Sequence, residues 1–214
     1  MRSSRQLVTE PIGLDVEALP RPIVWRDLFG NDHPVEIEIG MGKGTFLVEQ
    51  AKGRTETNFL GVEYARWFWR YASDRLRRNA CFNARTVRAE ASYFLHEFVA
   101  DASVSAIHLY FPDPWPKKRH HKRRLIQEPF VAEMCRVLQP RGRLQIATDH
   151  EDYFHQIEQV LAASPLERAQ YQPPGSAGQG EMVGTNFERK YRLQGRPFFT
   201  FAAVKPAPEP PSFS

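Results

Sequence analysis

The chain has 214 residues, of which 42% are hydrophobic and 25% charged, a composition typical of one globular domain and not of a disordered or collagen-like chain. It contains two cysteines, Cys81 and Cys135, outside any Cys-x-x-Cys pair, so we expect neither a disulfide framework nor a metal site. No run approaches the 18 apolar residues of a membrane span, and the first residues lack the apolar stretch of a secretory signal. We therefore expect a cytoplasmic protein.

The net charge of +4 comes from one short segment. Between Lys117 and Arg124 the sequence is KKRHHKRR, with six Lys or Arg in eight positions. Removing these six leaves 23 of the 29 basic residues against 25 acidic ones, a net charge of −2. Such a local excess is typical of a contact with a polyanion. A solvated loop or a targeting tag is the alternative.

Short β-branched runs alternate with helix-like runs along most of the chain. The sequence predicts strands at Val35–Ile39, Asn58–Glu63, Arg85–Glu90, Ser105–Phe111 and Arg143–Thr148. It predicts helices at Thr45–Gly53, Tyr64–Asn79, Ser92–Ala100, Leu125–Gly142 and Asp152–Ala163. This alternation predicts an α/β fold, with a parallel sheet covered by helices on both faces.

The two ends of the chain depart from this alternation. We expect an N-terminal extension over residues 1–34 and one domain over residues 35–204. Within the domain, Pro173–Gly184 has the composition of a flexible loop, and Phe198–Val204 predicts a last strand. Residues 205–214, KPAPEPPSFS, contain four prolines and predict a disordered tail.

Three glycines, Gly40, Gly42 and Gly44, directly follow the first predicted strand. A dinucleotide fingerprint would need a further glycine where Thr45 stands, and a P-loop would need Ser or Thr after Lys43. The pattern therefore predicts a tight turn that lets the backbone approach a ligand, without a phosphate-binding signature. A plain strand-to-helix turn fits it equally well.

Four carboxylates accompany the predicted strand ends: Glu38, Glu63, Glu90 and Asp113. Ligands of open parallel sheets bind at the carboxyl ends of the strands, so these side chains would converge on one crevice. Such a crevice repels a pyrophosphate and favours a ligand with cationic groups and ribose hydroxyls. S-adenosylmethionine has these groups, so charge complementarity favours it over NAD. The alternative is that each acid only solubilises a strand end.

The fourth strand is followed by FPDPWPKKRHHKRR, in which Pro112, Pro114 and Pro116 restrict every second residue. We expect a stiff, extended arm that holds Asp113 and Trp115 at the mouth of the crevice. A carboxylate can accept N–H bonds from a nucleobase, and an indole can stack on one. Trp115 would serve equally well as a core anchor.

The predicted helix Tyr64–Asn79 is rich in arginine and carries three consecutive aromatic residues, Trp67, Phe68 and Trp69. Consecutive helical residues point in different directions, so all three cannot be buried together. We expect one of them to be exposed, at an interface or on RNA. A helix with core aromatics and solvated arginines is the simpler alternative.

These motifs together resemble the bacterial tRNA (guanine-N7-)-methyltransferases. The resemblance rests on GMGKG after Glu38, FPDPWPKKRHHKRR, ATDHE at Ala147–Glu151 and TNFE at Thr185–Glu188, and it runs from about Val35 to Val204. It implies a Rossmann-like class I methyltransferase fold, with a mostly parallel seven-stranded sheet and a last antiparallel strand. It also implies S-adenosylmethionine as cofactor and tRNA as partner, with no membrane and no obligate protein partner, in a monomer or homodimer.

The resemblance implies the following site residues. The cofactor would contact Glu38, Gly40, Gly42, Glu63, Glu90 and Asp113, and Asp113 would also be catalytic. The target nucleotide would contact Lys117, Asp149, Thr185, Asn186, Phe187 and Glu188. RNA would contact Lys118, Arg119, Lys122, Arg123 and Arg124. The substrate would be the guanine at position 46 of the tRNA variable loop. The family more usually has Asp or Asn where this chain has Glu90.

The expected reaction needs no general base, because guanine N7 carries a free lone pair and no proton. We therefore expect Asp113 to orient the base. The alternatives are an S-adenosylmethionine-dependent methyltransferase acting on another RNA site or a non-RNA substrate, a non-enzymatic RNA-binding protein, and an NAD-dependent dehydrogenase, which the glycine spacing opposes.

Overall fold

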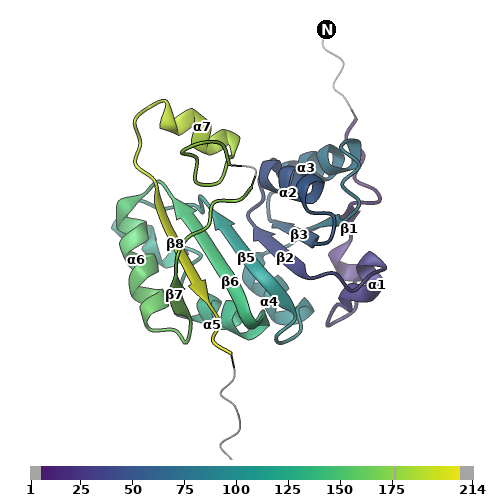
Figure 1. Cartoon of the computed structure of the whole chain (residues 1–214), viewed down its shortest axis with the longest axis horizontal. Helices are drawn as coiled ribbons and strands as arrows, with labels where there is room; N and C mark the ends of the chain where they lie inside the picture. Colours follow the sequence, from purple (N-terminus) through teal and green to yellow (C-terminus); the bar gives the residue numbers. More distant parts are fainter. Residues whose placement is uncertain (1–5, 176, 208–214) are drawn as a thin grey trace, which may run out of the picture.

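The computed structural model describes residues 6–175 and 177–207, which fold around one sheet (Figure 1). The strand order is β1-β4-β3-β2-β5-β6-β8-β7. The strands are β1 Gly13–Leu14, β2 Val35–Ile39, β3 Asn58–Glu63, β4 Ala84–Arg88, β5 Val104–Tyr110, β6 Leu138–Thr148, β7 Glu167–Ala169 and β8 Phe199–Val204. Neighbouring strands are parallel, except that β8 runs antiparallel to β6 and β7. The expected mostly parallel sheet with a last antiparallel strand is therefore confirmed.

Helices cover both faces of the sheet, as expected. They are α1 Trp25–Phe29, α2 Thr45–Gly53, α3 Arg66–Arg78, α4 Ala91–Phe98, α5 Glu128–Val137, α6 Glu151–Ala162 and α7 Asn186–Arg192, with 3-10 turns η1 Val16–Ala18 and η2 Lys118–Arg123. The apolar sides of α2 and α3 contribute to one core cluster, and those of α4, α5 and α6 to the other. The sheet is therefore a buried layer, and its residues can reach solvent or a ligand only at the edge strands and at the strand ends.

The described part of the N-terminal extension is folded onto the domain. Its Ile12 is fully buried in the cluster with α2 and α3, and Ile23 is buried in the cluster on the opposite face. Between them, β1 pairs with β4 as an edge strand, so the described residues form eight strands where the family resemblance implied seven. Burial of these two side chains stabilises the docked segment by a few kcal/mol.

Two other elements differ from the sequence prediction. Helix α5 ends at Val137, and Leu138 already belongs to β6, which is irregular between the positions opposite Val104 and Ala106. Tertiary pairing with β5 therefore overrides the helical pattern at this point. At the other end, the Arg141 amide donates to the Lys205 carbonyl over 2.8 Å, so pairing continues just past β8. The rest of the predicted disordered tail, residues 208–214, lies outside the described residues.

The central strand β2 is buried along its whole length although it contains two glutamates. Glu36 is compensated by Arg54 and His108. The Arg54 Nη1 donates to Glu36 Oε2 over 2.9 Å, and the His108 Nε2 lies 2.9 Å from the same oxygen. Burial raises the pKa of the Glu36 carboxyl, but these hydrogen bonds and charges outweigh it and lower the pKa from 4.5 to about 2. The ionised form of Glu36 therefore stabilises the fold.

Replacing Glu36 with glutamine tests this linkage. A carboxyl whose pKa is depressed on folding contributes stability above its unfolded pKa, and this contribution is lost as the pH falls through 4.5 towards 2. We expect E36Q to lower the free energy of unfolding by about 3 kcal/mol at pH 7, and the difference from the wild type to shrink below about pH 4.5. Urea unfolding of both proteins between pH 7 and pH 3 measures it. A difference that stayed constant with pH would contradict the assignment.

Candidate active site

A glycine turn joins β2 to α2, at the end of the sheet where the carboxyl ends of the parallel strands lie. Gly40, Gly42 and Gly44 have φ angles of +74°, +52° and +66°, a left-handed conformation that side chains disfavour. At Gly44 a Cβ atom would also lie 2.9 Å from the Cβ of Ala72 in α3. At Gly40 and Gly42, by contrast, a Cβ would meet nothing within 4 Å. The turn therefore requires glycine for its backbone and leaves open space above its first half.

Glu63, at the end of β3, fixes this turn in place. Its Oε2 accepts a hydrogen bond from the Gly42 amide over 3.0 Å, and its Oε1 accepts one from the Ala65 amide over 2.8 Å. The carboxylate is half-buried, and each oxygen retains a second lone pair. Glu63 therefore orients the glycine turn and can also accept hydrogen bonds from a ligand hydroxyl.

Glu38 lies two residues before the turn, and its side chain is only 4% exposed. Its Oε2 has no hydrogen-bond partner among the described residues. Burial and the charge of Glu63 raise the pKa of the Glu38 carboxyl well above its usual value, opposed by a hydrogen bond from the Leu47 backbone. Buried polar groups normally have a partner, so this oxygen marks a place where a donor or a cation would be strongly favoured.

Glu90 is positioned differently from the other acids at the strand ends. It is the N-cap of α4, where its Oε1 accepts from the Ser92 amide over 3.0 Å and its Oε2 from the Tyr93 amide over 2.8 Å. The side chain is exposed, and this cap explains why a carboxylate stands there. Contact of Glu90 with a cofactor stays a prediction.

The segment after β5 is held by a buried arginine. Arg124 is 3% exposed, and its guanidinium donates to the Pro114 carbonyl and to Gln156 Oε1, each over 2.8 Å, and to Asp152 on α6. Its guanidinium carbon also lies 4.9 Å from the ring centroid of Tyr153. The guanidinium of Arg124 is thus buried and paired inside the protein, and a contact of Arg124 with RNA stays a prediction. Arg124 pins the proline segment to α6.

The pinned segment is bent. Trp115 has a φ of +44° and Phe111 a φ of +54°, so two left-handed residues interrupt the extended arm that the prolines predict. Asp113 is exposed, and no side-chain hydrogen bond of it is found among the described residues. Trp115 is half-buried, with the Arg123 guanidinium 5.0 Å from its ring centroid. The loop therefore presents a free carboxylate next to a partly covered indole.

The basic run forms the 3-10 turn η2. Four of the predicted RNA contacts are exposed: Lys118, Arg119, Lys122 and Arg123. Lys117, the predicted nucleotide contact at the start of the run, is exposed as well. The turn places these cations on the surface beyond the end of β5. This surface can neutralise phosphates.

Helix α7 contains the second half of the predicted nucleotide site. Thr185 is its N-cap, and the Thr185 Oγ1 accepts from the Glu188 amide over 3.1 Å. Glu188 is fully buried and accepts from the amides of Met182, Val183 and Gly184 and from Arg192. Burial alone raises the pKa of the Glu188 carboxyl, but these donors lower it below its usual value. The carboxylate of Glu188 thus shapes the loop before α7 and is not free for a base.

The T-x-x-E spacing of this stretch is the capping-box signature of a helix start, and it could have predicted α7 from the sequence. Asn186 opens the helix. Figure 1 shows α7 beyond the ends of β5 and β6, on the side where the basic run begins.

Aromatic contacts join α7 to the loop that carries Asp113. Phe187 is 39% exposed, and its ring centroid lies 4.7 Å from that of Phe111 and 4.5 Å from that of Tyr191. Asp149, at the end of β6, pairs with Arg196 over 2.8 Å. The structure therefore brings Phe187 and the loop with Asp113 together, with Asp149 held at the neighbouring strand end.

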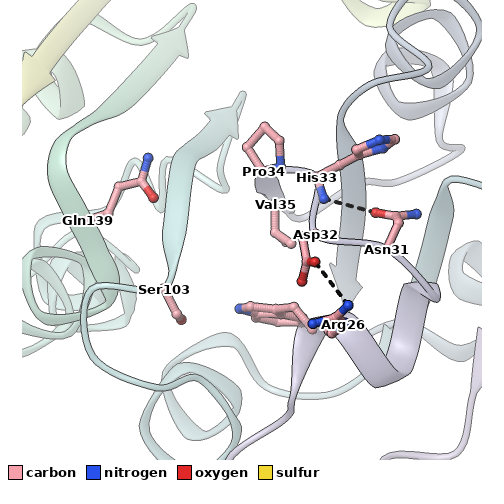
Figure 2. Close-up of a pocket in the computed structure, with 9 residues that line it drawn as sticks. Arg26, Asn31, Asp32, His33, Pro34, Val35, Ser103 and Gln139 are labelled. Atoms are coloured by element: carbon pink, nitrogen blue, oxygen red, sulfur yellow. Dashed lines mark hydrogen bonds and ion pairs between the residues drawn. The ribbon is translucent and has the colours of Figure 1, made fainter.

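A separate hollow of about 220 Å³ lies near the amino ends of β2 and β5 (Figure 2). Its rim is held by Asn31, whose Oδ1 accepts from the His33 amide over 3.0 Å, and by an Arg26–Asp32 ion pair of 3.5 Å. None of the predicted site residues lines it. Because parallel sheets bind ligands at the carboxyl ends of their strands, we place the active site at the glycine turn.

The described residues contain no group of three His, Cys, Asp or Glu side chains that could hold a metal ion. No helix in the same part of the chain is both long and apolar enough to cross a membrane.

Comparisons with known proteins identify the family and the fold of the chain. A family model described as "Putative methyltransferase" matches residues 32–201. The tRNA (guanine-N(7)-)-methyltransferase of Geobacillus kaustophilus is 38% identical over 189 residues, which cover 85% of this chain and 84% of that protein. The enzyme of the same name from Bordetella pertussis is 44% identical over 149 residues, or 70% of this chain, but the match spans only 59% of that longer protein.

Solved structures give the same fold at low sequence identity. The 30S ribosomal A1408 methyltransferase from an uncultured bacterium superposes with a TM-score of 0.58 at 14% identity, over 85% of this chain and 92% of that one. The aminoglycoside resistance methyltransferase NpmB1 gives a TM-score of 0.57 at 17% identity, over 80% of this chain and 87% of that one. The sheet is therefore a class I methyltransferase fold. The match over residues 32–201 and the identity to the two curated relatives place this chain in the family of the bacterial tRNA (guanine-N7-)-methyltransferases.

Proposed function

We propose that this protein transfers the methyl group of S-adenosylmethionine to N7 of a guanine in tRNA, at position 46 of the variable loop. The observation that carries the proposal is the buried, unpaired carboxylate of Glu38 beside the glycine turn that Glu63 holds. The names of the curated relatives support the reaction and the substrate class. The cytoplasm, where tRNA is found, is the proposed location, and the protein acts there as a monomer or homodimer.

The residues at the turn fit the methyl donor. S-adenosylmethionine supplies an electrophilic methyl group on a sulfonium, together with an ammonium and ribose hydroxyls. Glu38 would accept hydrogen bonds from the cationic amino acid end, which would return its carboxyl to the ionised form. Glu63 would accept from the ribose, and the open space over Gly40 and Gly42 would admit the nucleoside. Glu90, if it contributes, would do so with the lone pairs that the α4 cap leaves free.

The acceptor side needs orientation more than proton transfer, because guanine N7 has a free lone pair. Asp113 would accept hydrogen bonds from guanine N1–H and N2–H, a donor pair that adenine lacks. Phe187 would stack on the base, and Lys117 would neutralise its phosphate. Asp149 and Thr185 would border the nucleotide. Alignment of reacting atoms contributes roughly 7–11 kcal/mol in well-oriented systems, so these positioning contacts can supply much of the catalysis.

The alternative, methylation of another RNA site or of a non-RNA substrate, differs in what the basic turn η2 does. The four exposed cations of η2, together with Lys117, favour a polyanionic substrate. Incubation with methyl-labelled S-adenosylmethionine and bulk tRNA, followed by nucleoside analysis, decides between them. N7-methylguanosine is the expected product, and label in any other nucleoside or none in tRNA would overturn the proposal.

Replacing Glu38 with glutamine tests the cofactor contact. Because the pKa of Glu38 is raised in the free protein and a cation lowers it, wild-type binding of S-adenosylmethionine should release protons and tighten as the pH rises above the usual pKa of a glutamate carboxyl. We expect E38Q to bind at least about tenfold more weakly and to lose this pH dependence. Calorimetry in buffers of different ionisation enthalpy measures both. E90Q is the matched control and should keep the pH dependence, whereas a pH-independent wild type would contradict the assignment.

Replacing Asp113 with asparagine tests the orienting role. Asparagine keeps the shape but presents an N–H₂ group in place of one acceptor oxygen, so we expect kcat to fall by about 10²-fold, with no recovery at higher pH. The pH dependence of kcat in both proteins is the measurement. A wild-type profile governed by one ionisation that D113N abolishes would instead indicate proton abstraction.

The contrast between exposed and buried cations gives a third test. Replacing Lys118 and Arg119 together with glutamine should reduce the slope of log affinity for tRNA against log salt by about two, with little effect on stability. R124Q removes one charge of the same run but should lower the unfolding temperature, because it removes the hydrogen bonds of the guanidinium to the Pro114 carbonyl and to Gln156. Filter binding and thermal unfolding measure these effects. If R124Q has normal stability but a reduced slope of log tRNA affinity against log salt, Arg124 contacts RNA directly.

A further inference from the structure

An aromatic cluster on α3 is not used by the proposed reaction. Trp67 is 56% exposed and Phe68 is 37% exposed. The ring of Trp67 stacks on Tyr71 with a centroid distance of 5.3 Å and an interplanar angle of 20°, and Phe68 meets it edge-on at 5.1 Å. We call these three residues the aromatic platform. Tyr71 stacks on the indole and holds it in place, while more than half of Trp67 stays exposed.

Trp69 shows that this exposure is not a general property of the helix. It is half-buried and packs with the cluster between α3 and the sheet, where its Cζ2 would lie 3.0 Å from a Cβ at Gly13. Trp69 thus anchors α3 to β1, and the fold does not require Trp67 and Phe68 on the surface. An exposed, pre-oriented indole is costly in water unless it has a partner.

The charge around the platform indicates the kind of partner. Helix α3 has five arginines and one acid, Asp74, which is buried and paired with Arg77 and Arg78. Together, α3 and the basic run contain 11 of the 29 basic residues but only one of the 25 acidic ones, so the rest of the chain has a net charge of −6. The protein therefore has two positive regions on a negative body, and one of them contains an exposed indole.

The two positive regions flank the proposed site. Trp67 follows the carboxyl end of β3, and the basic run follows the carboxyl end of β5. Only β2, with its glycine turn, lies between these strands, so they are about 10 Å apart across the sheet. One nucleic acid chain can span that distance. Aromatic stacking with arginines around it is the way in which proteins hold unpaired bases.

Resting on the proposed function, we propose that the aromatic platform stacks on a base of the substrate tRNA other than the target guanine. A second copy of this chain is the competing occupant. In a twofold symmetric dimer the same patch faces itself, so two helices with a net charge of +4 each would be opposed. Like charges disfavour that arrangement, and a polyanion is favoured by both the charge and the π-face.

The test compares three substitutions. W67L keeps an apolar side chain but removes the π-face, W67F retains a ring, and F82L is the matched control. Phe82 is 57% exposed but precedes β4, at the opposite edge of the sheet. We expect W67L to raise both KM and Kd for tRNA about tenfold, with kcat, the Kd for S-adenosylmethionine and the salt slope unchanged. W67F should retain most of the affinity, and F82L should match the wild type. Thermal unfolding of all variants confirms that they fold.

The outcomes are separable. Unchanged tRNA affinity in W67L, or equal losses in W67L and F82L, would overturn the platform. A wild type that sediments as a dimer and a W67L variant that sediments as a monomer would assign the patch to self-association and overturn it as well. If the wild type binds tRNA with an affinity that depends on Trp67 but does not methylate it, the proposed function is overturned and the assignment of the aromatic platform still holds.

Discussion

Glu36 and Glu38 leave the central strand on the same face, two residues apart, and both are buried. A buried carboxylate needs a nearby cation or hydrogen-bond donors; without them it takes up a proton. Glu36 finds Arg54 and His108, so it is ionised and stabilises the sheet. Glu38 has an oxygen without a partner and lies next to the charge of Glu63, so its ionised form is disfavoured until a ligand compensates it. The structure thus maintains one buried carboxyl group with an unsatisfied oxygen at the point where the glycine turn opens.

Charges of both signs are used for structure as well as for binding. Arg124 belongs to the basic run by sequence, but its guanidinium is buried and secures the loop with Asp113 to α6. Glu188 belongs to the predicted nucleotide site, but its carboxylate accepts hydrogen bonds from three backbone amides before α7. Arg124 fixes the loop that carries the exposed Asp113. Glu188 fixes the loop before α7, the helix that carries the exposed Phe187. Buried ionic anchors therefore position the exposed groups that the proposed reaction needs.

The sheet order places these loops. The strands β3, β2 and β5 are adjacent, so the loops that follow them meet at one edge although they are separated by dozens of residues in the chain. The residues proposed to contact the methyl donor lie at the centre of this region, and basic residues lie on either side of it, on α3 and on η2. Such a division lets one surface hold a cationic cofactor and a polyanionic substrate side by side without mutual neutralisation.

The alternating α/β fold, the glycine turn and the acids at the strand ends could all be predicted from the sequence, because they follow from local periodicity and from backbone conformations that glycine adopts readily. The family could be predicted as well, through motifs that are contiguous in the chain. Which charged and aromatic side chains are accessible could be learned only from the folded structure. Arg124 and Glu188 resemble their exposed neighbours in sequence but are buried, and Trp69 resembles the exposed Trp67 but is half-buried. Burial and pairing depend on side chains from distant elements such as α6 and β1, and no local pattern records them.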